Sequence, residues 1–156
     1  MSETTPRGPA ESRRRAREAA LQMLYQAEVG HLSLPLVRGT FWAVGEDEPV
    51  TPPERTRAFA ERLAEGTLAS LGRIDPLIEA HSAHWRLERM PVVDRLVLRL
   101  GVYELLEPDD ADAAVVIDEA VELAKRFSTP DAGKFVNGVL DAIRRAIAED
   151  AASKTE

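Results

Sequence analysis

The segment VVDRLVLRLGVYELL, residues 92–106, decides the fold of this chain. Its spacing favours a helix, but its apolar residues lie on almost every side of that helix instead of along one stripe. A helix that is apolar all round is buried, because a surface helix keeps a polar face toward water. We therefore expect residues 92–106 to be packed between neighbouring elements.

Two further helices are predicted on the C-terminal side of this segment. Residues 116–127 repeat apolar side chains at helical spacing after the polar turn EPDDADA. Thr129, Pro130 and Asp131 then supply a cap, a first-position proline and a first-turn acid. Gly138 in this last helix costs about 1 kcal/mol relative to alanine, which indicates close packing of another backbone. The apolar residues of this helix recur at Phe135, Val139, Ile143 and Ile147.

The N-terminal side predicts one long helix followed by an irregular segment. Ser12 is the expected N-cap of a helix that runs to about Val29. Residues 31–50 are interrupted by proline and glycine, so we expect a loop with one short helix. Phe41 and Trp42 are the expected buried anchors of that segment.

Residues 51–91 hold two more predicted helices. The sequence TPPE at residues 51–54 combines a cap, prolines and an acid, so a helix is expected from there to about Gly72. A shorter helix is expected to begin at Asp75 and Pro76, and a connector ends at Pro91.

No segment alternates with a period of two for long enough to form a convincing strand. The sequence therefore predicts an all-α chain with six or seven helices. We expect one helical domain over residues 12–149, with disordered tails at residues 1–11 and 150–156.

The composition is that of an ordinary globular protein, with 44% hydrophobic and 30% charged residues among 156. The apolar stretches are far shorter than the roughly 18–20 residues that a membrane span needs, so we expect no membrane segment. The chain has no cysteine, which excludes disulfides and a thiol nucleophile. The N-terminus lacks the apolar core of a secretory signal, so a cytoplasmic location is expected.

Charge is distributed unevenly along the chain. The net charge of −7 argues at first against nucleic acid, because phosphate binding needs positive surface. Residues 101–124, however, contain many acids and no lysine or arginine, so the acids are concentrated there. Near the N-terminus, an arginine cluster without any acid is formed by Arg13, Arg14, Arg15 and Arg17. Two poles of opposite charge indicate two different partners.

The arginine cluster is unfavourable for the helix that carries it, because the cations repel one another and meet the positive end of the helix dipole. Residues that cost local stability are candidates for function. Guanidinium groups pair with phosphates and stack on unpaired bases, so we infer RNA or DNA binding, with Tyr25 as a candidate stacking platform. The alternatives are a general preference for arginine, of which the chain has 17 against 3 lysines, and a core role for Tyr25.

No catalytic motif is present. The sequence lacks GxSxG, a glycine-rich phosphate loop and GxGxxG. His81 and His84 lie three residues apart on one helical face, a spacing that can begin a metal site, but no third ligand is indicated. We therefore expect no catalytic residues, no metal and no cofactor, and hence no enzyme.

Four stretches resemble hallmark segments of the bacterial NusB family of transcription antitermination factors. They occur in the family's order and span most of residues 12–147, and they are SRRRAREAALQMLYQAEVG, VVDRLVLRLGVYELL, VIDEAVELAKRFS and GKFVNGVLDAI. The resemblance implies two packed three-helix bundles, at about residues 12–72 and 73–149.

The resemblance also implies a function. Members of the family bind the single-stranded boxA segment of nascent ribosomal RNA together with NusE, which is ribosomal protein S10. The pair helps RNA polymerase to resist termination. The chain is therefore expected to be a non-catalytic RNA-binding adaptor in an antitermination complex.

Individual residues match the family's sites. The arginine cluster matches its arginine-rich RNA-binding motif, and Tyr25 matches an aromatic residue near the RNA. The positions that match residues beside the RNA in the C-terminal part are Asp131, Lys134 and Phe135. The positions that match the helix facing NusE are Asp94, Arg99 and Tyr103.

Several of these matches have a structural alternative. Asp131 is also an ordinary first-turn acid, and Phe135 fits the apolar series of the last helix. Asp94 and Arg99 fit a narrow solvent strip on an otherwise buried helix.

Three other functions fit parts of the sequence. One is a helical interaction scaffold whose arginines contact an acidic protein. Another is the N-terminal RNA-binding fragment of a ribosomal RNA cytosine methyltransferase, which needs a further catalytic domain and cysteines. The third is a helix-turn-helix DNA binder, which needs a basic recognition helix that the sequence does not show.

Overall fold

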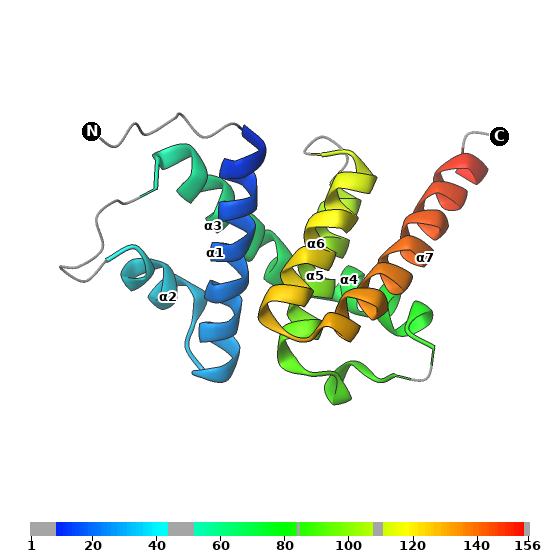
Figure 1. Ribbon diagram of the computed structural model, residues 1–156, viewed down its shortest axis with the longest axis horizontal. Helices are drawn as coiled ribbons and strands as arrows, with labels where there is room; N and C mark the ends of the chain where they lie inside the picture. The colour runs from blue at the N-terminus through cyan, green and yellow to red at the C-terminus, as the bar shows by residue number, and fades with distance from the viewer. Residues whose placement is uncertain (1–8, 44–51, 84, 108–110, 155–156) are drawn as a thin grey trace. The chain divides into compact units, whose positions relative to one another are not determined.

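The computed structural model describes residues 9–43, 52–83, 85–107 and 111–154 (Figure 1). Within these ranges it contains seven α-helices, one short 3-10 helix and no strand, so the all-α prediction is confirmed. None of the helices in these ranges is long and apolar enough to cross a membrane. The elements are α1 (Pro9–Val29), α2 (Leu34–Phe41), α3 (Glu54–Ala69), α4 (Leu71–His81), η1 (Leu87–Arg89), α5 (Val92–Leu106), α6 (Ala113–Phe127) and α7 (Pro130–Lys154).

The chain divides into two compact units, Met1–Glu65 and Gly66–Glu156. The first unit contains α1, α2 and most of α3, and the second contains the end of α3 and the helices that follow. The bundle bounds implied by the family resemblance, about 12–72 and 73–149, stay a prediction.

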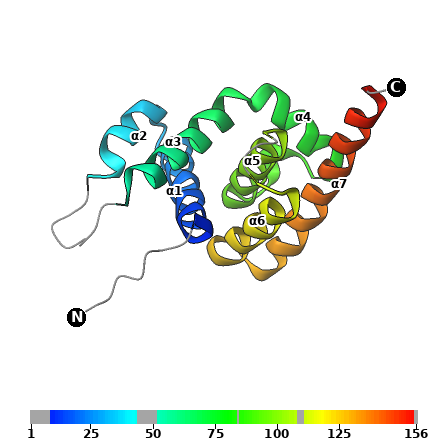
Figure 2. The same ribbon diagram turned by 90° about the horizontal axis from the view of Figure 1, so that it is seen from above.

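In the second unit, α5 packs against α4, α6 and α7. Figure 2 shows these three helices around α5. Gly101 lets α7 come close, because a Cβ atom added there would lie 2.8 Å from Leu140 Cδ1. The prediction that residues 92–106 form a buried helix is confirmed. The fully or almost fully buried apolar side chains of α5 include Leu96, Val97, Leu98, Leu100 and Val102.

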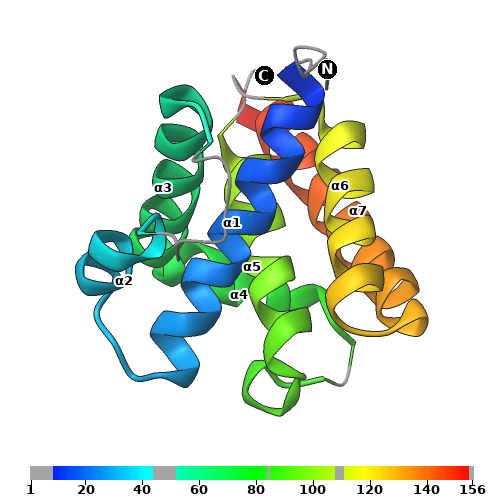
Figure 3. The ribbon, with the colours of Figure 1, turned by 60° about the vertical axis from the view of Figure 1, so that its left-hand side comes forward.

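In the first unit, α2 lies beside both α1 and α3 (Figure 3). Several of the buried residues of α1 and α3 are alanines. The buried apolar side chains of this unit include Ala16, Ala20, Met23 and Leu24 of α1, Val37 of α2, and Ala60 and Leu63 of α3.

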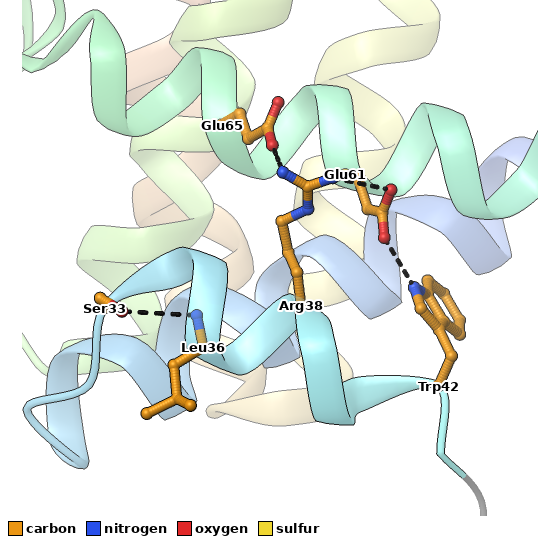
Figure 4. Close-up of polar contacts among 6 residues, drawn as sticks. All are labelled: Ser33, Leu36, Arg38, Trp42, Glu61 and Glu65. Atoms are coloured by element: carbon orange, nitrogen blue, oxygen red, sulfur yellow. Dashed lines mark hydrogen bonds and ion pairs between the residues drawn. The ribbon is translucent and has the colours of Figure 1, made fainter.

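Polar contacts join α2 to α3, as Figure 4 shows. The Ser33 hydroxyl accepts a hydrogen bond from the Leu36 N–H at 3.4 Å and so caps α2. Arg38 forms ion pairs with Glu61 and Glu65 of α3. The short helix predicted within residues 31–50 is therefore confirmed, while residues 44–50 lie outside the described part of the chain.

Phe41 and Trp42 are only half-buried, so the prediction of two buried anchors is wrong in degree. Their rings meet edge to face with centroids 4.8 Å apart. The Trp42 Nε1 donates to Glu61 Oε1 at 3.1 Å. Because an indole N–H needs an acceptor and this acceptor is a partly exposed carboxylate, the ring stays partly in solvent.

Both ends of the chain are more helical than the sequence predicted. α1 begins at Pro9 instead of after a cap at Ser12, because a proline at the first helical position loses no hydrogen bond and fixes a helical φ. Residues 9–11 of the predicted tail are therefore helical. α7 continues to Lys154, which pairs with Asp150 at 3.1 Å, so residues 150–154 are also helical.

The bounds of α3 and α4 differ from those predicted. α3 begins at Glu54, the last residue of the expected helix start at residues 51–54, and ends at Ala69. α4 already begins at Leu71, because the Ser70 carbonyl accepts bonds from Arg73 N and Ile74 N, both at 2.9 Å. Gly72 therefore ends no helix, and Pro76 lies inside α4 instead of at its start.

The start of α7 is confirmed, since the Thr129 Oγ1 accepts the Ala132 N–H at 3.1 Å. The prediction of close backbone packing at Gly138 is wrong, because a Cβ atom added there would meet open space. Gly138 faces solvent. Close approaches occur instead at Gly101 and at Gly133, where an added Cβ would lie 2.9 Å from Lys125 Cγ.

Candidate nucleic-acid interface

The arginine cluster of α1 divides into an exposed and a buried part. Arg13 and Arg14 are exposed and Arg15 is half-buried, whereas Arg17 is only 4% exposed. An α-helix turns by about 100° per residue, so four nearby side chains cannot all point the same way. We call Arg13, Arg14 and Arg15 the arginine face, because these three are accessible to a large ligand.

Phe59 of α3 is surrounded by three arginines, two from α1 and one from α3. The guanidinium carbons of Arg13, Arg17 and Arg62 lie 5.3, 5.9 and 5.1 Å from the centroid of its ring. Each distance is within the range of a cation–π interaction. These contacts tie α1 to α3, so Arg17 has a structural role that its place in the cluster did not reveal.

A hollow of about 300 Å³ lies between α1 and α3 in the first unit. Its charged lining residues are Arg13 and Arg55. Sequence reasoning missed the arginines of α3, because they alternate with acids in ERTRAFAER and look balanced in charge. The signal that could have identified them is that they lie on the same predicted helix as the aromatic residue Phe59. The residues that line the hollow are Pro9, Ser12, Arg13, Arg55, Thr56 and Phe59.

Tyr25 is 43% exposed, so the alternative of a core tyrosine is wrong. It follows Arg14 by eleven residues, which is close to three helical turns, and the two therefore share a face of α1. At about 1.5 Å per residue their Cα atoms are roughly 16 Å apart along the helix. The first unit thus presents the cation of Arg14 and the ring of Tyr25 along one accessible face of α1.

The start of α7 presents a different set of groups. Asp131 and Lys134 are exposed, and Phe135 is half-buried. Val139 and Ile143 of the same series are buried, whereas Phe135 and Ile147 at its two ends are half-buried. Its ring lies 6.0 Å from that of Trp85, with 52° between the ring planes.

Trp85 is a residue that sequence reasoning did not single out. It is 54% exposed, and its backbone carbonyl accepts the Ser82 hydroxyl at 2.8 Å. A tryptophan in a polar connector was the signal that could have identified it. We call Trp85 and Phe135 the aromatic pair.

The three predicted partner residues of α5 are largely integrated into the second unit. Asp94 is 7% exposed and Tyr103 is 8% exposed. The Arg99 guanidinium donates two hydrogen bonds to the Asp75 carboxylate, at 2.9 and 3.0 Å. The alternative that Asp94 belongs to a solvent strip is therefore wrong.

Asp94 has an unusual environment for a first-turn acid. An acid at the third helical position often accepts the N–H of the N-cap residue, but the N-cap of α5 is Pro91, which has none. The Asp94 Oδ1 is buried without a hydrogen-bond partner among the described residues. A buried acceptor without a hydrogen bond costs about 1–3 kcal/mol.

The histidine pair that was weighed as a metal site is not described completely, because His84 lies outside the described residues. The His81 Nδ1 lies 2.9 Å from the Leu77 carbonyl oxygen. Within the described ranges, no three His, Cys, Asp or Glu side chains are grouped so as to hold a metal ion.

Comparison with known proteins identifies close relatives of the chain. Residues 14–145 match the model of the NusB family. The transcription antitermination protein NusB of Sorangium cellulosum is 47% identical over 132 residues, which is 85% of this chain and 91% of that protein.

Two solved structures are also similar. The structure of T. maritima NusB has a TM-score of 0.75 and 40% identity, and the match covers 85% of this chain and 90% of that one. A structure of the antitermination factors NusB and NusE in complex with double-stranded RNA has a TM-score of 0.74 and 31% identity, covering 87% and 98%.

Proposed function

The chain belongs to the NusB family, and we propose on that basis that it is a non-catalytic adaptor that binds boxA-type ribosomal RNA together with NusE and promotes transcription antitermination. The proposal includes RNA polymerase as the enzyme whose termination is resisted, and the cytoplasm as the place of action.

The observation that carries the RNA part of the proposal is the arginine face with Tyr25 on the same helix. The chain as a whole has a net charge of −7, so phosphate binding needs a local surface of opposite sign. Arg13, Arg14 and Arg15 supply cations that solvent reaches, and Tyr25 supplies a ring on which an unpaired base can stack. Asp131, Lys134 and Phe135 belong to the same proposal as its C-terminal part.

The partner part of the proposal is supported by α5 and by the acidic segment that follows it. Ribosomal proteins are generally basic, so an acidic surface steers them toward this chain. Asp94 places a negative charge in the first turn of α5, and Arg99 and Tyr103 lie on the same helix. Asp94, Arg99 and Tyr103 are therefore the proposed NusE-binding residues.

The RNA part is tested by comparing four nucleic acids at one salt concentration in a filter-binding assay. They are a boxA-type single strand, a scrambled strand, the boxA sequence as duplex RNA, and duplex DNA. We expect the boxA single strand to bind most tightly, and more tightly still when NusE is present. Equal binding of all four, with no effect of NusE, would contradict the proposal.

The partner part is tested by Asp94→Asn, which keeps the shape of the side chain and removes its charge. We expect weaker binding to NusE, while the binding of RNA alone and the melting temperature stay close to the wild type. Titration by calorimetry measures both affinities. If both fall together, Asp94 supports the fold and does not contact the partner.

A further inference from the structure

The hollow between α1 and α3 is lined by residues of the N-terminal parts of both helices. Pro9, Ser12 and Arg13 come from the start of α1, and Arg55 and Thr56 come from the start of α3. The first turn of a helix carries N–H groups without an intrahelical acceptor and the positive end of the helix dipole. Two such ends at one hollow favour an anion there.

Among the described residues that line the hollow, the two charged ones are arginines. Arg13 and Arg55 belong to different helices, and Arg55 is exposed to solvent. Acids are present in the same first turns, at Glu11 and Glu54, but neither is among the described residues that line the hollow. The chain as a whole is negatively charged, but the described charged residues at the hollow are positive, and phosphate binding requires positive charge.

The volume of the hollow and its lining residues indicate which class of ligand it can bind. Its volume of about 300 Å³ is at the lower end of the range of small-molecule sites, which is enough for one nucleotide unit. Phe59 is half-buried and contributes an aromatic surface beside the two arginines. Ser12 and Thr56 add hydroxyl groups, which hydrogen-bond to phosphate and sugar oxygens.

We propose that this hollow binds one nucleotide of the RNA, with its phosphodiester group between Arg13 and Arg55 and its sugar or base against Phe59. The proposal rests on the proposed RNA-binding function and extends the RNA surface from α1 onto α3. Arg55 is its new determinant, because it lies outside the arginine cluster that the sequence indicated.

The first test is Arg55→Ala, with Arg73→Ala as the matched control. Arg73 is an exposed arginine of α4, so both variants remove one exposed positive charge. Arg55→Ala should weaken RNA binding about three- to tenfold at low salt and reduce the slope of log K against log salt by about 0.7, the value for one phosphate contact on a single strand. Arg73→Ala should leave the slope unchanged. Equal slopes for wild type and Arg55→Ala would overturn the proposal.

The second test probes occupancy directly and uses the absence of cysteine from the chain. Ser12→Cys places a single thiol at the hollow, and Ala80→Cys places one at an exposed position of α4 as the control. Saturating boxA-type RNA should slow maleimide labelling of the first thiol at least fivefold and leave the control thiol unaffected. Unchanged labelling of the first thiol in the presence of bound RNA would overturn the proposal.

Labelling in the presence of small anions distinguishes an RNA site from a site for free phosphate. Inorganic phosphate or a nucleoside monophosphate, at the same concentration as the RNA, should give no protection. If either protects as well as RNA, the hollow is a site for small free anions and the RNA proposal is wrong. If the wild-type chain does not bind RNA at all, the proposed function is wrong. If the wild-type chain binds RNA but the hollow variants do not show the expected changes, only the role of the hollow is wrong.

Discussion

The arginine face of α1 and Phe135 of α7 both belong to the proposed RNA surface, yet the arginine face and the aromatic pair that contains Phe135 offer opposite chemistry. The arginine face has three cations, with one exposed ring two to three turns further along. The aromatic pair has two rings in contact, flanked by Lys134 and by the acid Asp131. Residues that belong to one proposed RNA surface can therefore bind RNA by different interactions.

The difference is physical and can be measured. Cations bind phosphates by releasing counterions, so their contribution falls as salt rises. Rings bind bases by stacking, which depends little on salt and is worth about 1–3 kcal/mol per base. Salt dependence therefore separates the two regions, and variants that remove one contribution at a time can measure each.

The largest effect is expected when the arginine face is removed by changing Arg13, Arg14 and Arg15 together to alanine. The slope of log K against log salt should fall by about 2, since each contact to a single strand contributes about 0.7. Fluorescence anisotropy at several salt concentrations measures it. The control variant changes three other exposed arginines to alanine and so removes the same charge. These arginines lie on α4 and α7 and are Arg73, Arg144 and Arg145. Equal changes in the two triples would show that net charge, and not the face, is responsible.

Removal of the aromatic pair should lower affinity without changing the slope. Trp85→Ala and Phe135→Ala are each expected to weaken RNA binding by about 1–3 kcal/mol, the value of one stacked base. Phe127→Ala is the control, because Phe127 is also a partly exposed ring in the second unit. If the salt slope changes as much as it does when Arg13, Arg14 and Arg15 are replaced, the aromatic pair affects the phosphate contacts of charged residues and does not act by stacking.

Within the arginine cluster itself, Arg17→Ala should affect stability and Arg14→Ala should not. Arg17 is buried against Phe59, so its removal loses a cation–π contact and side-chain packing, about 1–3 kcal/mol of unfolding free energy. The exposed Arg14 should change it by less than about 0.5 kcal/mol. Urea denaturation followed by circular dichroism compares them, and equal midpoints would contradict the division of the cluster.

The smallest effect is expected at Asp131, whose carboxylate repels phosphate near the start of α7. Asp131→Asn should strengthen RNA binding by less than about 1 kcal/mol, and the gain should shrink as salt rises because screening weakens the repulsion. Affinity measured at two salt concentrations checks both statements. Weaker binding by a folded Asp131→Asn protein would mean that the carboxylate itself contributes to recognition.

The sequence predicted those features whose signals are local and redundant. The burial of α5 follows from apolar residues on all sides, and the start of α7 follows from three consecutive residues, each favourable there. Helix ends that depend on one residue were predicted less well. The sequence predicts a helix start at Asp75 and Pro76, although α4 begins at Leu71.

The site residues were predicted by type and position, but not by environment. Arg14 and Arg17 look alike in sequence, but Arg14 is exposed and Arg17 is buried next to Phe59, which is more than forty residues away. The environment of Asp94 likewise depends on burial and on the missing N–H of Pro91. Such distinctions arise from long-range packing, which no local pattern of residues encodes.

Gly66 near the end of α3 offers protein engineers a way to separate the position of a side chain from its chemistry. A Cβ atom added there would overlap the phenol ring of Tyr103, one of the proposed partner residues. Gly66→Ala therefore displaces the ring by steric volume alone and leaves its hydroxyl and aromatic character intact. A complex that tolerates Tyr103→Phe but not Gly66→Ala would depend on where the ring lies and not on the hydrogen bonds of its hydroxyl.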